Sequence, residues 1–460
     1  MTRSAAVARA TDYFNSGDFL ADLRRRVAFR TESGVPARRP DLHAYLNQEM
    51  VPAAHQLGAT ARVLGNPNAS GGPLLIARRH EGAGLPTVLT YGHADVVPAE
   101  PQRWRAGLDP WRVTVERDRW YGRGTADNKG QHTINLAALN QVLHARGGRL
   151  GFNLTILMET SEESGSPGLS EFCAQHGDEL AADLLIASDG PRVAAERPTV
   201  FLGSRGSATF TLRVPLRDRA YHSGNWGGLL RNPATVLASA LACLVNGQGR
   251  ILVPGLRPPP MPDNVRAALR TIPIGGGPDD PDIDEDWGEP GLTPAERVIG
   301  ANTLEVLSLS AGNPGTPVNA IPGSAHAHCQ LRFVPGTDIT RLAATVRDHL
   351  NARGFGMVTV EPGHVMNASR TDQDEPWVRF ALASLERAEG IPPTLLPNLG
   401  GSLPNDVFAD GIGLPTIWIP HSYPACAQHA PDEHLLAPLA RQALRLMTAL
   451  FWDLGEYPGR

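Results

Sequence analysis

The chain has 460 residues, with 42 lysines and arginines against 47 aspartates and glutamates and a formal net charge of −5. Ordinary shares of hydrophobic (42%) and charged (19%) residues predict a folded protein of two or three domains, and the slight acidity argues against a nucleic-acid partner. No apolar run predicts a membrane span or a secretory signal, and four widely spaced cysteines predict free thiols in a cytoplasmic protein.

The first and last parts of the sequence predict an α/β domain. Short apolar runs bounded by turn residues are typical of buried parallel strands, and longer amphipathic patterns are typical of the helices between them. We expect helices at Asp12–Thr31 and Pro40–Leu57, a strand at Pro86–Tyr91, a helix at Asn128–Ala145, strands at Phe152–Met158 and Asp183–Ala187 and, after an insertion, a helix at Pro376–Gly390, a strand at Pro415–Ile419 and a helix at Leu435–Leu454.

The insertion has a different pattern. Half-exposed strands at Ala208–Leu216, Thr303–Ser310, Ala325–Val334 and Met357–Glu361 and helices at Pro233–Val245 and Ile339–Arg353 give the order β-α-β-β-α-β. That order predicts a ferredoxin-like α+β domain at residues 206–365, inserted into a catalytic domain made of residues 1–205 and 366–460. Residues 254–294, with the acidic run from Asp279 to Glu289, are expected to form a solvated loop.

Acidic residues and histidines follow the predicted strands of the α/β domain. Open α/β sheets place their sites beyond the carboxyl ends of the strands, so these side chains are expected to gather at one edge. Each motif alone has an ordinary explanation as surface charge or, for the aspartate before the helix at 128–145, as a helix cap. The residues concerned are His93, Asp95, Asp127, Glu162, Glu163, Asp189 and His429.

Taken together, these residues indicate a metal centre. Histidine and carboxylate ligands without cysteine suit a catalytic zinc site. Five of these residues are candidate metal ligands, namely His93, Asp127, Glu163, Asp189 and His429. Five ligands are too many for one tetrahedral ion, but one shared carboxylate would let them hold two ions. Glu162, next to Glu163, is then free to act as a general base.

The motifs H-A-D-V-V-P, G-R-G-T-A-D-N-K-G, M-E-T-S-E-E-S-G-S, S-D-G, Y-H-S-G-x-W-G-G, R-F-V-P-G, G-G-S-L-P and H-A-P-D-E occur in this order between about residues 85 and 435. Their order resembles the dinuclear zinc peptidase/aminoacylase family. That family includes carnosinase-type dipeptidases, glutamate carboxypeptidase, succinyl-diaminopimelate desuccinylase and acetylornithine deacetylase, and the sequence is most similar to the carnosinase branch.

The resemblance implies a role for each residue at the predicted sheet edge. Asp127 would bridge two divalent ions, most simply Zn²⁺ with Co²⁺ or Mn²⁺ as alternatives, and the peptide bond after it would be cis. Glu162 would deprotonate a metal-bridging water, and Asp95 would orient His93. The remaining metal ligands would be His93 and Asp189 on one ion and Glu163 and His429 on the other.

The resemblance also assigns residues near the insertion. His222 would reach the active site of a partner subunit and stabilise the oxyanion, which implies a homodimer joined through the inserted lid domain. Arg332 would bind a substrate carboxylate, and Gly400, Gly401 and Ser402 would line the substrate end of the cleft. The carnosinase branch usually has Arg-Glu before Gly-Gly-Ser, whereas this chain has Asn398-Leu399.

The predicted function is metal-dependent hydrolysis of an amide bond in a dipeptide or a related small substrate with a free carboxylate. An aminoacylase acting on an N-acyl amino acid is the alternative, and a non-catalytic peptide-binding pseudoenzyme is a further one. A serine hydrolase of α/β type is disfavoured because the sequence has no G-x-S-x-G motif.

One residue stands out by its rarity. Lys129 is the only lysine, and the other 41 basic residues are arginines. It lies two positions after Asp127, so we predict that its compact ammonium group has a structural role beside the metal carboxylates, although chance is the competing explanation.

Overall fold

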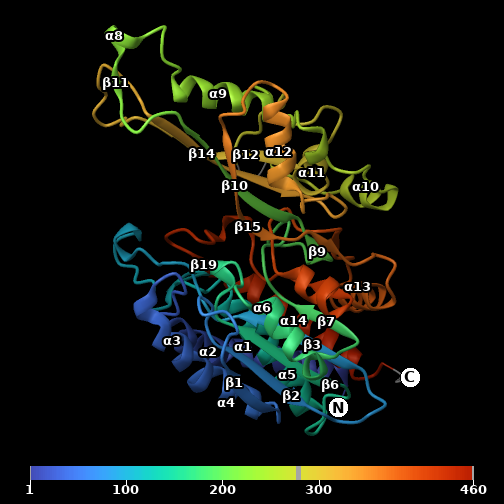
Figure 1. The fold of residues 1–460 in the computed structure, drawn as a ribbon. Coiled ribbons are helices and arrows are strands. Elements are labelled where there is room, and N and C mark those ends of the chain that lie inside the picture. Colours follow the sequence, from blue (N-terminus) through green and yellow to red (C-terminus); the bar gives the residue numbers. More distant parts are fainter. Residues whose placement is uncertain (1, 276–280, 458–460) are drawn as a thin grey trace. The chain divides into compact units, whose positions relative to one another are not determined.

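The computed structural model describes residues 2–275 and 281–457. The chain divides into two compact units (Figure 1). Unit 1 comprises Met1–Gly203, Arg370–Pro397 and Pro404–Arg460, and unit 2 comprises Ser204–Ser369 and Asn398–Leu403. The segment 398–403, which we expected in the first domain, therefore groups with the inserted one.

Unit 1 is built on a mixed sheet with the strand order β1-β2-β6-β3-β7-β18-β8-β17. Its central strands β6, β3, β7 and β18 are parallel, as predicted, whereas β1, β2 and β8 pair antiparallel with their neighbours β2, β6 and β18. The strands are β1 (Thr60–Leu64), β2 (Leu74–Arg79), β3 (Thr87–His93), β6 (Asn153–Glu159), β7 (Leu184–Ala187), β8 (Thr199–Phe201), β17 (Thr394–Leu396) and β18 (Thr416–Trp418).

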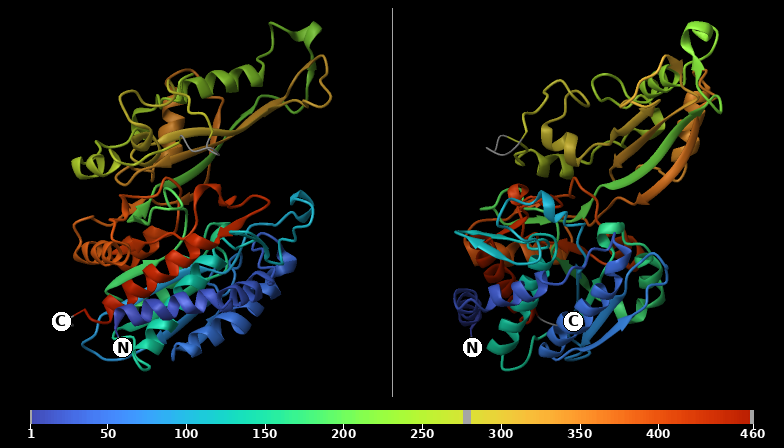
Figure 2. Two further views of the ribbon diagram at one scale, coloured as in Figure 1. Left: turned by 180° about the vertical axis from the view of Figure 1, so that it is seen from behind. Right: turned by 90° about the vertical axis from the view of Figure 1, so that its left-hand side faces the viewer.

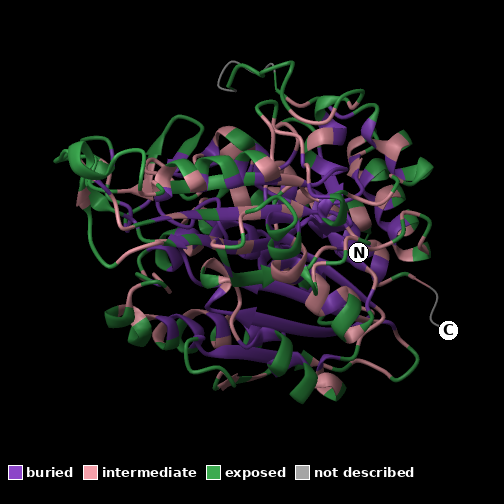
Figure 3. Ribbon diagram, turned by 45° about the horizontal axis from the view of Figure 1, so that its top comes forward, coloured by how far each residue is buried: buried purple, intermediate pink, exposed green. Residues whose placement is uncertain are grey.

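The central strands are almost entirely buried because both faces of the sheet are covered, as Figure 3 shows. On one face, Leu154, Ile156 and Met158 join the main core with the helices α1, α2, α5 and α14. On the other face, Tyr91 and Trp418 pack in aromatic contacts. The helices of the unit are α1 (Arg3–Asn15), α2 (Asp18–Val27), α3 (Arg39–Tyr45), α4 (Val51–Gln56), α5 (Lys129–Ala145), α6 (Leu169–Gln175), α7 (Gly177–Leu180), α13 (Pro376–Glu389) and α14 (Ala437–Leu454).

Two predicted helices are interrupted. The helix expected at Asp12–Thr31 is two helices, α1 and α2, because Gly17 has a φ of 90° that a continuous helix does not allow. The helix expected at Pro40–Leu57 contains a π-helical turn at Leu46–Met50 between α3 and α4. Short strands outside the main sheet are β4 (Thr114–Glu116), β5 (Arg119–Tyr121) and β19 (His434–Leu436), which pair with one another, and β9 (Gly203–Ser204) and β16 (Ser369–Arg370), which also pair.

Unit 2 has the predicted β-α-β-β-α-β arrangement, with the antiparallel strand order β12-β14-β10-β15. Helices α9 and α12 pack together against one face of this sheet (Figure 2). The strands are β10 (Gly206–Pro215), β12 (Thr303–Ala311), β14 (Ser324–Phe333) and β15 (Thr359–Met366), with a small pair β11 (Tyr221–His222) and β13 (Ala320–Ile321). The helices are α8 (Ser223–Trp226), α9 (Pro233–Leu244), α10 (Asp263–Leu269), α11 (Pro294–Ile299) and α12 (Leu342–Asn351).

The expected solvated loop at residues 254–294 contains helix α10, whose Val265 and Leu269 are buried. Within its acidic run, Asp279 and Asp280 lie outside the described residues, and residues 281–289 are exposed or half-buried. No helix in residues 2–275 or 281–457 is both long and apolar enough to cross a membrane.

Candidate metal centre

Three adjacent parallel strands of unit 1 end at the candidate site. His93 is the last residue of β3, and Glu162 and Glu163 lie in a short 3-10 turn three residues beyond the end of β6. Asp189 follows the end of β7 by two residues. Parallel strands bring their carboxyl ends to one edge, so the pattern of strand followed by acid or histidine becomes a cluster in space.

Asp127 lies at the centre of this cluster. Its Oδ1 is 3.0 Å from His93 Nε2, and its Oδ2 is 2.9 Å from His429 Nε2. The carboxylate thus faces one histidine with each oxygen. The peptide bond from Asp127 to Asn128 is cis, as predicted from the resemblance, and Asn128 Nδ2 donates to the Ser188 carbonyl at 2.8 Å.

Two further carboxylates complete the surroundings of the histidines. Glu163 Oε2 is 3.0 Å from His429 Nε2, and Asp189 Oδ2 is 3.5 Å from His93 Nε2. Potential ligand atoms of His93, Asp127 and Glu163 all lie within 4.8 Å of one another. The His429 side chain is 57% exposed while the carboxylates are buried, so the cluster is open to solvent on the His429 side.

Asp95 contacts both His93 and the turn that carries Glu162 and Glu163. Its backbone carbonyl lies 3.1 Å from His93 Nδ1 and can only accept, so Nδ1 carries a proton and Nε2 is the ring nitrogen that faces the carboxylates. Its carboxylate accepts the backbone N–H groups of Glu162 at 3.2 Å and Glu163 at 3.1 Å. Asp95 therefore positions the turn that carries both glutamates, in addition to contacting His93.

The crowding of carboxylates shifts the pKa values of the cluster strongly. Burial and the charge of Asp127 raise the pKa of Glu163 to about 7, and loss of solvation raises the pKa of Glu162 well above its ordinary value. Hydrogen bonds to Asp127 and Glu163 raise the pKa of His429 to about 11. Burial lowers the pKa of His93, but the charge of Asp189 and the hydrogen bond to Asp127 outweigh it and leave that pKa well above the ordinary value.

The donor set fits divalent metal ions. Among the described residues, Glu163 Oε1 and Asp189 Oδ2 are buried oxygens without a hydrogen-bond donor. Buried polar atoms are normally satisfied, and carboxylate oxygens pointing into a cluster of imidazole nitrogens are satisfied by a cation. Nitrogen and oxygen ligands without a thiolate match zinc in catalytic sites.

The remaining predicted site residues belong to unit 2. Arg332, on β14, donates from Nη1 to Ser402 Oγ at 2.7 Å and from Nε to Gln330 Oε1 at 3.1 Å, and burial lowers its pKa. Gly400 accepts a hydrogen bond from Arg205 Nε at 2.8 Å through its carbonyl, and Gly401 is its exposed neighbour. Arg332 and Ser402, both predicted to bind substrate, are therefore in direct contact.

His222 and Asn398 also lie in unit 2. His222 is exposed on β11, and its Nδ1 accepts the backbone N–H of Gly224 at 3.1 Å. Asn398 is fully buried, and its amide donates to the carbonyl of Ile299 at 3.0 Å. Asn398 thus anchors the start of the Gly-Gly-Ser segment to Ile299.

Lys129 is completely buried at the start of α5. Its Nζ donates to the Phe29 carbonyl at 2.6 Å and lies 5.1 Å from the centre of the Tyr45 ring, and burial lowers its pKa to about 7. The ammonium group thus binds a backbone carbonyl and a ring face, and the charges of Glu433 and Asp95 act on it as well. Its structural role beside the site stays a prediction.

Sequence reasoning missed two contacts of Asp127. Gln428 Nε2 donates to Asp127 Oδ2 at 3.3 Å, and the carboxylate of Glu433 accepts the Asp127 backbone N–H at 3.0 Å. Glu433 is the last letter of the H-A-P-D-E motif that contains His429, so its position within a motif was the available signal.

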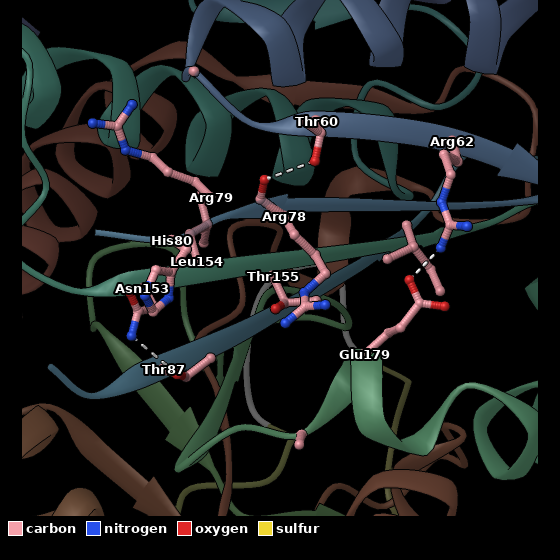
Figure 4. Close-up of a pocket in the computed structure, with 13 residues that line it drawn as sticks. Thr60, Arg62, Arg78, Arg79, His80, Thr87, Asn153, Leu154, Thr155 and Glu179 are labelled. Atoms are coloured by element: carbon pink, nitrogen blue, oxygen red, sulfur yellow. Dashed lines mark hydrogen bonds and ion pairs between the residues drawn. The ribbon is translucent and has the colours of Figure 1, made fainter. Parts of the chain in front are cut away.

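A groove of unit 1 lies at the opposite end of the strands. It has a volume of about 630 Å³ and includes Thr87 and Asn153, the first residues of β3 and β6, whereas the metal cluster follows the last residues of the same strands. Figure 4 shows Arg62 and Glu179 paired at this groove. None of the predicted site residues is among those that line it.

Comparison with known proteins identifies the family of the chain. Residues 89–453 match the family described as Peptidase family M20/M25/M40. The chain belongs to this family. It is therefore a hydrolase of the metallopeptidase type, and the family resemblance seen in its motifs is confirmed.

Individual relatives are dipeptidases. The chain is 30% identical over 367 residues to the Beta-Ala-His dipeptidase of Mus musculus, a match that covers 73% of this chain and 71% of the relative. It is 29% identical to the Cysteinylglycine-S-conjugate dipeptidase of Corynebacterium striatum over 74% of each chain. The crystal structure of human carnosine dipeptidase 1 shares the fold, with a TM-score of 0.81, 22% identity and coverage of 98% of this chain and 99% of that one.

Proposed function

We propose that this M20-family chain is a dipeptidase that uses two divalent metal ions, with zinc as the physiological metal. The observation that carries the proposal is the placement of Asp127, which faces His93 with one carboxylate oxygen and His429 with the other. Two ions shared by this carboxylate would have His93 and Asp189 as further ligands on one side and Glu163 and His429 on the other.

The metals and Glu162 would divide the chemistry. When bound, the ions would lower the pKa of an attacking water and polarise the scissile carbonyl. Glu162 takes the proton from that water and passes it to the leaving amine, a task suited to a carboxylate whose pKa is raised. Asp95 holds the His93 ring and the Glu162 backbone in the geometry that these steps need.

Residues of unit 2 supply substrate recognition in this proposal. Arg332, supported by its contact with Ser402, binds the free carboxylate of the substrate, and Gly400 and Gly401 offer backbone N–H groups.

The partner subunit's His222 stabilises the oxyanion, so the active form is a homodimer joined through unit 2. Domain roles follow: unit 1 binds metal, and unit 2 serves as the lid and dimerisation domain. The spacing of the cysteines supports a cytoplasmic location.

The test combines metal removal with a substrate screen. We expect chelation to abolish hydrolysis, Zn²⁺, Co²⁺ or Mn²⁺ to restore it, and titration to give two ions per chain. Dipeptides and N-acyl amino acids are then compared by product analysis, because a dipeptide gives two amino acids and an N-acyl amino acid gives one amino acid and one acid. Preference for N-acyl substrates would replace the dipeptidase with an aminoacylase, and fewer than one ion per chain would favour a non-catalytic binding protein.

A further inference from the structure

Glu433 binds the whole loop that leads to Asp127. The side chain is buried, and its Oε2 accepts hydrogen bonds from Arg123 Nη1 at 2.7 Å and from the Gly124 N–H at 3.0 Å. Its Oε1 accepts the N–H groups of Ala126 at 2.9 Å and Asp127 at 3.0 Å. Each oxygen thus accepts two hydrogen bonds from one short stretch of chain.

The backbone of Glu433 belongs to a different segment, the one that carries His429. Ala427, His429 and Asp432 in this segment have φ values of 59°, 59° and 63°. Non-glycine residues rarely adopt this left-handed conformation, which persists where surrounding contacts fix it. The Glu433 carbonyl also accepts the Gly122 N–H at 2.9 Å, so side chain and backbone both fasten this segment to the loop.

The two joined segments carry two of the candidate metal ligands. Asp127 Oδ2 and His429 Nε2 are 2.9 Å apart, so a small displacement of either segment would change their spacing. We propose that Glu433 is a positioning residue whose carboxylate sets the Asp127 loop against the His429 segment, so that both ligands are in register before a metal ion binds. The inference rests on the proposed function in taking Asp127 and His429 as ligands.

Glutamine at position 433 would test this arrangement without changing its volume. One oxygen of Glu433 faces Arg123 Nη1 and the Gly124 N–H, and the other faces two backbone N–H groups. A glutamine amide has an acceptor on one side and a donor on the other. In either orientation its NH₂ group would meet two donors, so two of the four hydrogen bonds are lost.

A matched control exists at the other end of the sheet. Glu81 is also a buried carboxylate, and it accepts the backbone N–H groups of Leu150 at 2.7 Å and Gly151 at 2.9 Å together with Arg79 Nε at 2.8 Å. It lies beside Asn153, the first residue of β6, about 20 Å from the metal cluster at some 3.3 Å per strand residue. Glu81→Gln therefore disturbs a similar network without touching the candidate ligands.

Zinc affinity of the metal-free protein is measured by competition with a chelating indicator, together with the melting temperature. Both variants are expected to lower the melting temperature, but only Glu433→Gln should weaken zinc binding, by about 10- to 100-fold as for other residues that orient metal ligands. The proposal would be overturned if the zinc affinity of Glu433→Gln lay within twofold of that of the wild-type protein. It would also be overturned if Glu81→Gln weakened zinc binding as much as Glu433→Gln does.

Hydrogen exchange of the unchanged, metal-free protein provides a second test that needs no variant. If Glu433 sets the loop before metal binding, the amides of Gly124, Ala126 and Asp127 exchange slowly without zinc. Exchange as fast as in an exposed loop, with protection only after zinc addition, would contradict the proposal. Failure of the unchanged protein to bind zinc would instead contradict the proposed function, while the exchange result would still decide the role of Glu433.

Discussion

The adjacent glutamates 162 and 163 offer a direct test of the division between catalysis and metal binding. Glu163 has a ligand atom within 4.8 Å of those of His93 and Asp127, whereas Glu162 is not part of that group. The same change, glutamate to glutamine, at neighbouring positions should therefore have different consequences. Both backbone N–H groups are bound by Asp95, so the turn itself is preserved in either variant.

For Glu162→Gln we expect unchanged zinc affinity and a large loss of kcat. General acid–base catalysis contributes about 10²- to 10⁴-fold, so the barrier should rise by about 2.7–5.4 kcal/mol at 1.36 kcal/mol for each factor of ten. For Glu163→Gln we expect weaker zinc binding, because the neutral amide replaces a carboxylate that faces His429 at 3.0 Å.

The assay measures zinc affinity by indicator competition and dipeptide hydrolysis at saturating zinc. Glu163→Gln should recover part of its activity as zinc is raised, whereas Glu162→Gln should not. Full turnover by zinc-loaded Glu162→Gln would refute the assignment of the base. Unchanged zinc affinity in Glu163→Gln would remove that residue from the ligand set.

Three further predictions concern other parts of the chain. Arg332→Met should raise KM for a dipeptide by about 10- to 100-fold, since a charged hydrogen bond contributes about 1.5–3 kcal/mol; an equal effect on the C-terminal amide of the same dipeptide would contradict carboxylate recognition. Lys129→Arg should lower the free energy of unfolding in urea by about 1–3 kcal/mol, because the larger guanidinium must fit a fully buried site against the Phe29 carbonyl, and an unchanged value would support chance as the reason for the single lysine. Three of the four thiols should react slowly with a disulfide reagent in the folded protein, because burial raises the pKa of each to about 12 and the thiolate is the reactive form; rapid titration of all four would show that these sites open readily. These thiols are Cys173, Cys329 and Cys426.

The sequence by itself determined the family, the buried strands that lead to the site and the strand and helix pattern of the insertion. Buried parallel strands need continuous apolar runs, and the residues just past them must lie at one edge, so periodicity and position were enough to group His93, Glu163 and Asp189. The same reasoning overlooked β1 and β2, which carry arginines at their exposed positions, and it joined α1 to α2 across Gly17. Local sequence patterns predict burial well, but they predict the ends and interruptions of helices poorly.

Only the tertiary structure decided which side chains support the ligands. Asp127 and Glu433 are separated by 306 residues, and their hydrogen bond depends on how the H-A-P-D-E segment returns to the start of α5. Lys129 lies in sequence beside the proposed bridging ligand, but its side chain leads to Phe29 and Tyr45. A motif shows that residues are neighbours along the chain, whereas the direction of each side chain is set by the packing of distant segments around it.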